Sequence, residues 1–327
     1  MMPHGDGAQG LSAPRRREGH LALFVLLLCG GYLAALWWID RGNGTFARLG
    51  AIWPLLLLAM LPVSVSYLFR FWRWRWLLQR QGHAVPFGLG WAAYLAGFAL
   101  TATPGKAGEL LRIRYFARMG VPAGRTLAVF VFERTSDLLV ILALSLLAAP
   151  VFPTLGTLAA VVLGLVALLF GAAAWPALLA WLDRLGRRLP GPWLRRATQF
   201  ALYAARELRA CLGTAQLTRS LIAGAAAWGL TSVVFVGLCK GLALDLDIMV
   251  AFGIYPLAML IGALSFVPGG VGTTELAIVL MLHQLGIATA DAIAVAVAAR
   301  LVTLWYAIAV GTLAICVAEF LQRRQAG

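Results

Sequence analysis

Charged side chains interrupt the apolar stretches of this sequence, and their types suit anion binding or proton transfer. Arginine is always charged, and its planar guanidinium binds phosphate oxygens through a fork of donors. Glutamate and aspartate can orient an arginine or carry a proton. The candidate substrate-binding residues are Lys106, Glu109, Arg112, Glu133, Arg134, Asp137, Glu275 and Arg300. Glu133 and Asp137 share a helical face and would repel each other unless a cation such as Arg134 or Lys106 lies with them.

The remaining ionisable residues indicate neither a metal site nor a catalytic constellation. The cysteines and histidines are dispersed and have no metal-binding or redox spacing: Cys29, Cys211, Cys239, Cys316, His4, His20, His83 and His283. No histidine, serine or cysteine constellation accompanies the glutamates. The sequence therefore predicts no metal, no cofactor and no enzymatic activity of the chain itself.

The elements that position these residues are apolar helices in a membrane. Charged residues make up 12% of the 327 residues, against about 25% in soluble domains. Six stretches can span a bilayer: Leu21 to Ile39, Ala51 to Phe69, Arg125 to Ala149, Thr154 to Trp175, Ser220 to Cys239 and Ala290 to Phe320. The first is an uncleaved span in our interpretation, although Arg15 to Arg17 ahead of it also suit a signal peptide. Two shorter stretches, Phe87 to Thr103 and Ile248 to Val267, each run into a Pro-Gly pair.

The distribution of basic residues predicts the topology. The net charge is +14, and the basic residues responsible for it lie between apolar segments. The positive-inside rule explains this distribution, so nucleic-acid binding is excluded. If both Pro-Gly segments are re-entrant hairpins, most arginines lie in the cytoplasm with both termini, and only Arg41, Arg48 and Lys240 lie outside. We therefore expect a multi-pass protein of the bacterial inner membrane, with a cytoplasmic tail 1–20, one membrane domain 21–320 and a tail 321–327.

Two segments are predicted at the membrane surface. Phe69 to Arg80 alternates arginine with tryptophan at the end of a span, which is typical of an interfacial anchor for anionic head groups. The cytoplasmic loop 176–219 contains a helical pattern with one apolar and one basic face. The apolar face comprises Leu194, Ala197, Ala201, Ala205, Leu208 and Leu212. This helix either lies in the interface or packs on the protein's own cytoplasmic end.

An internal repeat relates the two halves, at about 51–149 and 220–320. The turn PGKAGE contains Pro104, Gly105 and Gly108, and the turn PGGVGTTE contains Pro268, Gly269, Gly270 and Gly272. Downstream of each turn, Arg134 aligns with Arg300, and arginine within a span is rare. The first unit starts outside and the second inside, so the repeats are inverted. Inverted repeats with broken helices at matching positions are typical of transporters with a site near the midplane.

Intramembrane charges are costly, about 2.5–3.5 kcal/mol each on insertion scales. They must therefore be paired or hydrated. Two interpretations stay open: a purely structural network of ion pairs, and a pathway for a polar head group or for protons.

The motifs PGKAGELLR, VFERTSDL and FVPGGVGTTE resemble the flippase-like membrane domain of the lysylphosphatidylglycerol synthase transmembrane family, over most of the chain. The resemblance implies an all-α membrane protein of about six transmembrane helices and two re-entrant hairpins, without the soluble synthase domain of the fused members. It also implies transport of a lipid, without naming that lipid.

We therefore expect transbilayer movement of a polar or anionic, phosphate-containing lipid through a midplane cavity, with lipid-synthesis enzymes as candidate partners. Two alternatives remain. One is a membrane-embedded enzyme that uses Glu109 or Glu275 as a base, and the other is a scaffold for lipid-synthesis enzymes.

Overall fold

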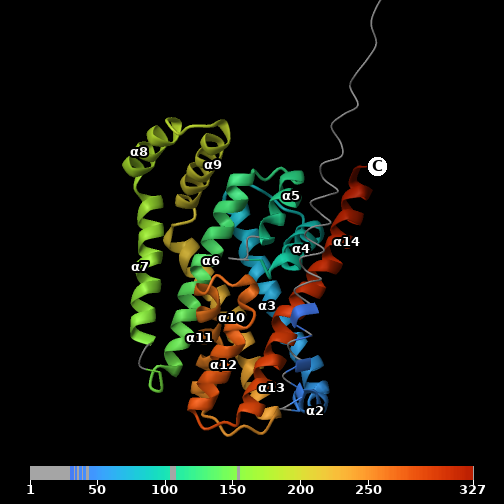
Figure 1. The fold of residues 1–327 in the computed structure, drawn as a ribbon. Coiled ribbons are helices and arrows are strands. Elements are labelled where there is room, and N and C mark those ends of the chain that lie inside the picture. The colour runs from blue at the N-terminus through green and yellow to red at the C-terminus, as the bar shows by residue number, and fades with distance from the viewer. Residues whose placement is uncertain are drawn as a thin grey trace, which may run out of the picture.

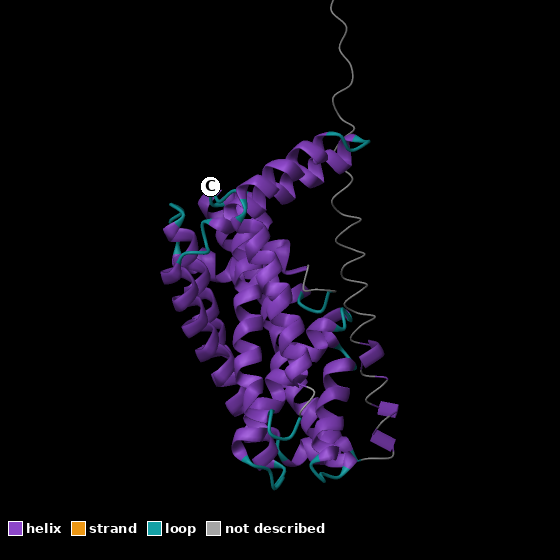
Figure 2. Cartoon of the chain, turned by 90° about the vertical axis from the view of Figure 1, so that its left-hand side faces the viewer, coloured by secondary structure: helices purple, strands orange, loops and turns teal. Residues whose placement is uncertain are grey.

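The computed structural model describes residues 30–32, 34, 37–38, 40–41, 44–103, 108–152 and 155–326. These residues form helices joined by short turns, with no strand among them (Figure 2). The predicted all-α polytopic class is confirmed. Most of the predicted first span, together with Pro104, Gly105 and Lys106, lies outside the described residues.

From Gly44 onward, the described residues of the first half form five α-helices. They are α2 (Thr45–Ala51), α3 (Trp53–Arg80), α4 (Phe87–Ala96), α5 (Leu111–Arg118) and α6 (Ala123–Ser145). A 3-10 turn, Gly97–Leu100, extends α4 toward the Pro-Gly turn. Pro122 precedes α6 in extended conformation, which starts that helix without a side-chain cap.

The second half follows a peripheral group of three helices. That group is α7 (Leu155–Ala174), α8 (Pro176–Arg187) and α9 (Pro192–Arg209). Then come α10 (Thr214–Gly241), α11 (Ile248–Leu264), α12 (Thr273–Gln284), α13 (Thr289–Arg300), a π-helical turn (Leu301–Trp305) and α14 (Tyr306–Ala326). The Asp247 carboxylate accepts hydrogen bonds from the N–H groups of Met249 and Val250 and so caps α11.

Four described helices are long and apolar enough to cross a membrane. They are Trp53–Arg80, Leu155–Ala174, Thr214–Gly241 and Thr289–Arg324. The 23-residue α6 is also long enough, but it carries Glu133, Arg134 and Asp137. By contrast α5 and α12, with 8 and 12 residues, are too short to cross about 30 Å of hydrocarbon.

The two Pro-Gly segments form helical hairpins in opposite halves of the molecule. In Figure 1, α4 and α5 lie in the upper half beside the C-terminus, whereas α11 and α12 lie in the lower half. The helix α4 packs on α14, and α11 packs on α6, while α3 packs along α10. Each hairpin therefore contacts the last helix of the other half, as expected for a two-fold relation between inverted repeats.

The helix α3 does not end where the predicted span ends. It continues from Phe69 to Arg80, so it has 28 residues and a length of about 42 Å. Arg70 and Arg73 are 7% and 1% exposed, and Trp74 is fully buried. The prediction that this segment is an interfacial anchor is therefore wrong for these three residues, which point into the protein.

The loop 176–219 folds into the helices α8 and α9 at the upper end of the molecule (Figure 1). A proline opens each of them at the first turn, where no backbone N–H is needed. The helix α9 packs on α6, α7 and α8 through Leu202, Ala204 and Leu208. The predicted apolar face is only partly right, because Leu208 is buried but Leu194 is 39% exposed.

Candidate functional site

The helix α6 places two carboxylates in the centre of the protein. Glu133 is fully buried and Asp137 is 3% exposed, and their spacing of four residues puts them on one face. Arg73 of α3 lies between them. Its Nη2 donates to Glu133 Oε1 at 3.0 Å and to Asp137 Oδ1 at 2.8 Å, and its Nη1 donates to the Ser220 carbonyl. The repulsion between the carboxylates is therefore offset by Arg73, an arginine that the sequence interpretation had assigned to an interfacial anchor.

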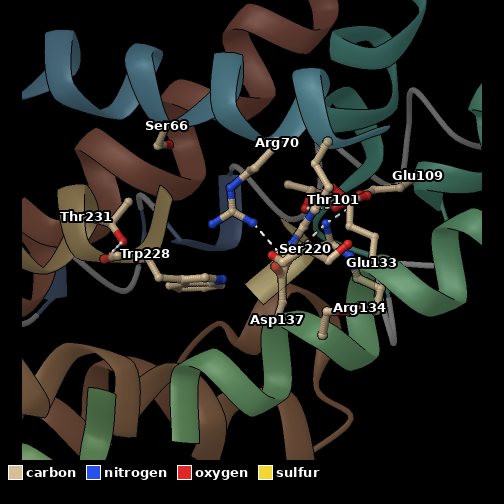
Figure 3. Close-up of polar contacts among 12 residues, drawn as sticks. Ser66, Arg70, Thr101, Glu109, Glu133, Arg134, Asp137, Ser220, Trp228 and Thr231 are labelled. Atoms are coloured by element: carbon tan, nitrogen blue, oxygen red, sulfur yellow. Dashed lines mark hydrogen bonds and ion pairs between the residues drawn. The ribbon is translucent and has the colours of Figure 1, made fainter. Parts of the chain in front are cut away.

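A second arginine of α3, Arg70, also binds the Asp137 carboxylate. Arg70 Nη1 donates to Asp137 Oδ2 at 3.0 Å. Its guanidinium carbon lies 4.7 Å from the centroid of the Trp228 ring, a cation–π distance. Figure 3 shows Arg70 reaching from α3 toward Asp137, with Trp228 of α10 on its other side.

The first hairpin contributes a third arginine, Arg112. It lies 3.2 Å from Glu109 and 3.6 Å from Glu133, and its guanidinium carbon is 3.9 Å from the Tyr94 ring centroid. A Cβ at Gly97 would meet Arg112 Nε at 2.5 Å, so glycine lets the hairpin and the arginine approach. Arg112 is 1% exposed, so its side chain points into the protein and not toward a cytoplasmic loop.

Arg134 is the most loosely held of these arginines. Its Nη2 is 3.4 Å from Glu133 and 3.4 Å from Asp137, yet its Nε and Nη2 have no hydrogen-bond partner among the described residues. Its side chain is 19% exposed, against 1% for Arg73. The guanidinium therefore has donors available for another anion.

The second half holds a simpler ion pair. Arg300 Nε donates to Glu275 Oε1 at 3.0 Å, and Glu275 Oε2 accepts from the Gly272 N–H at 2.9 Å. A second Arg300 nitrogen donates to the Gly269 carbonyl. Gly269 and Gly272 have φ of +62° and +83°, which L side chains rarely adopt. Arg300 therefore fastens the turn of the second hairpin.

These groups surround a central cavity of about 90 Å³. Arg70, Glu109 and Arg134 from the first half and Arg300 from the second half line it, together with Trp228. Thr101 and Gly269, at the turns of the two hairpins, also line it. The cavity therefore lies where both hairpins end.

An adjoining cavity of about 190 Å³ shares Arg134, Trp228 and Gly269 with the central one. Its other polar groups are Asp137, Thr103 and Thr274. The Thr274 hydroxyl is buried and has no hydrogen-bond partner among the described residues. The adjoining cavity can thus accept a polar group.

We call the seven charged residues from the first half the charged cluster: Arg70, Arg73, Glu109, Arg112, Glu133, Arg134 and Asp137. Four arginines face three carboxylates in this cluster, so it carries a net positive charge. Mutual ion pairs offset part of the cost of burying these charges. An anion would suit the positive excess and the Nε and Nη2 of Arg134, which make no hydrogen bond with the described residues.

The structure brings the predicted residues of both halves to one place, except Pro104, Gly105 and Lys106, which lie outside the described residues. Glu109, Arg112, Glu133, Arg134, Asp137, Glu275 and Arg300 all lie in or next to the two cavities. Gly108 closes the first turn, where its N–H donates to Thr103 Oγ1 at 2.6 Å, and Gly270 is buried in the second. Their functional roles stay predictions.

The sequence did not identify Arg70, Arg73 and Trp228, or Tyr67, which also lines the central cavity. One signal was available, because Tyr67, Arg70, Arg73 and Trp74 recur at helical spacing and form one face of a helix. Trp228 offers no such signal, since a tryptophan in a span usually packs in the core.

The comparison with known proteins agrees with this architecture. No curated protein matches the chain. The family model described as "Lysylphosphatidylglycerol synthase TM region" matches residues 20–311, which is most of the 327 residues and includes both hairpins and the charged cluster. The predicted family is confirmed: this multi-pass membrane protein belongs to the lysylphosphatidylglycerol synthase TM region family.

Proposed function

We propose that the protein moves a lipid with an anionic, phosphate-containing head group across the bilayer, with the head group passing through the two cavities. One observation carries the proposal: Arg134 and Arg300, at matching positions of the two repeats, line one cavity where both hairpin turns meet. The family supports a lipid-related role in a membrane. The arginines favour phosphate as the group that is recognised.

The electrostatics of the cavity favour an anion over a neutral group. A cation at membrane depth is costly, and the charged cluster has one arginine more than it has carboxylates. Arg134 has donors that no described residue accepts. A phosphate oxygen would accept from these donors and neutralise the excess charge.

The hairpins supply the moving parts in this proposal. Both are re-entrant, because α5 and α12 are too short to span, and they enter from opposite sides of the membrane. Movement of one repeat against the other would open the cavities to each side in turn. The basic helices α8 and α9 and both termini then lie in the cytoplasm of a bacterial cell with the protein in its inner membrane, where lipid-synthesis enzymes can supply the substrate.

Reconstitution into liposomes tests this function. We place head-group-labelled lipid in one leaflet and follow its appearance in the other. The protein should speed this movement more for phosphatidylglycerol than for phosphatidylcholine, because only phosphatidylglycerol carries a net negative charge. Protein-free liposomes give the background rate. If every lipid in a panel of anionic and zwitterionic lipids crosses the bilayer at the same rate as in protein-free liposomes, the proposal is overturned.

The same liposomes distinguish transport from chemistry. We propose that the chain itself leaves the head group unmodified, so mass spectrometry of the recovered lipids should find only the lipids supplied. A new head-group mass that depends on Glu109 or Glu275 would instead support a membrane-embedded enzyme.

Cysteine labelling tests the orientation of the two hairpins. In a cysteine-free background, Arg114→Cys on α5 and His283→Cys on α12 should react with a membrane-impermeant maleimide from the cytoplasmic and the periplasmic side respectively. Both positions are exposed. Labelling of both introduced cysteines from one side would contradict the inverted arrangement.

A further inference from the structure

An apolar groove of about 790 Å³ runs between α7 and the second hairpin, outside the two polar cavities. Leu158 and Val161 of α7 form one wall, and Ile261 of α11 with Leu276 and Leu280 of α12 forms the other. The polar cavities account for none of these residues. The groove is therefore a separate feature of the molecule.

The groove opens toward the hydrocarbon of the membrane. Val161, Leu276 and Leu280 are 50%, 56% and 53% exposed, and the α7 wall belongs to a helix apolar enough to span. An apolar gap beside a membrane-spanning helix faces lipid tails and not water. The chemistry of the lining thus selects a hydrocarbon chain as the occupant.

The groove ends next to the adjoining cavity. Ile261 and Thr273 line the groove, and the residues that follow them in the sequence, Gly262 and Thr274, line the cavity. Only the thickness of α11 and α12 separates the two spaces. At the inner end the groove becomes polar, because the hydroxyl groups of Ser265 and Thr273 lie 3.1 Å apart.

The length of the groove suits an acyl chain. It follows α12 from Thr273 to Gln284, which is about 18 Å at helical rise. A lipid with its head group at the inner end could extend one chain along this path toward the membrane surface. The arrangement places an apolar channel and a polar cavity at the two sides of one hairpin turn.

We infer that this groove holds one acyl chain of the transported lipid while the head group occupies the adjoining cavity. The inference rests on the proposed function. It extends that function because it specifies recognition of the chain as well as of the head group, and it names the second hairpin as the element that separates the two parts of the lipid.

Filling the groove tests the inference. In liposomes, Leu280→Trp and Leu276→Trp should each lower the transport of diacyl phosphatidylglycerol roughly tenfold, since added bulk in a filled space is poorly tolerated. Leu313→Trp is the matched control. Leu313 is 68% exposed on α14, at the opposite side of the bundle from α7 (Figure 1), so its variant should transport at the wild-type rate.

A second measurement needs no variant. Phosphatidylglycerol with a photoactivatable diazirine in one acyl chain should cross-link to wild-type peptides from α7 and α12, and Leu280→Trp should abolish these cross-links. If Leu280→Trp abolishes the cross-links but transports at the wild-type rate, the groove holds a structural lipid and the inference is overturned. Cross-links only to peptides outside α7 and α12 would also overturn the inference. Failure of the wild-type protein to transport any lipid would instead contradict the proposed function itself.

Discussion

Arg134→Gln should abolish most lipid transport while leaving the folded protein as abundant and as stable as the wild type. Loss of charged hydrogen bonds to a phosphate costs about 1.5–3 kcal/mol, which is roughly ten- to hundredfold in affinity. Stability should change little, because Glu133 and Asp137 keep their hydrogen bonds to Arg73. Liposome transport and thermal unfolding in detergent measure the two effects separately.

Arg134→Lys separates charge from geometry at the same position. Lysine keeps the positive charge but loses the planar fork of donors, so transport should fall to a rate between those of the wild type and Arg134→Gln. If Arg134→Gln accumulates normally and transports at the wild-type rate, Arg134 does not contact the head group. If it unfolds at a much lower temperature, its role is structural.

Arg73→Gln should have the opposite outcome, a large loss of stability. Arg73 is 1% exposed and joins two buried carboxylates through hydrogen bonds of 3.0 and 2.8 Å. Removal of one partner of a buried ion pair costs about 3–5 kcal/mol. The unfolding temperature in detergent should therefore fall steeply, and less protein should accumulate in the membrane.

Two matched comparisons support the interpretation of that result. Arg73→Gln and Arg134→Gln remove the same charge from the same cluster, so a difference between them reports position and not net charge. Arg118→Gln is the surface control, because the Arg118–Glu319 pair is 3.5 Å long and exposed, and such pairs contribute about 0–1 kcal/mol. An unfolding temperature for Arg73→Gln equal to that of Arg118→Gln would refute the structural role of Arg73.

Hydropathy and the internal repeat could predict the helical class, the two hairpins and the shared position of Arg134 and Arg300. These features are local, because they depend on the length of apolar stretches and on Pro-Gly pairs. The burial of Arg70 and Arg73 is a tertiary property. An arginine at the end of an apolar stretch has the same sequence signature whether it meets head groups or turns inward toward Asp137.

Topology from arginine counting has the same weakness. It treats each arginine beside a span as an exposed residue, which is correct for Arg114 and wrong for the buried Arg112. The difference arises because Gly97 leaves room for the Arg112 side chain against Tyr94. That packing depends on how α4 meets α5, and no sequence period encodes it.

The charges are divided unequally between the repeats, and under the proposed function this inequality would affect the transport cycle. Two identical inverted repeats would give inward-open and outward-open end states of equal free energy. Here all seven members of the charged cluster belong to the first repeat, whereas Glu275 and Arg300 come from the second. When the repeats exchange conformations, the surroundings of the charged cluster and of the Glu275–Arg300 pair change in different ways. The inward-open and outward-open states would therefore differ in free energy. A transporter of this construction rests on one side of the membrane when empty, and its substrate must bind the opposite state more tightly to reverse that preference.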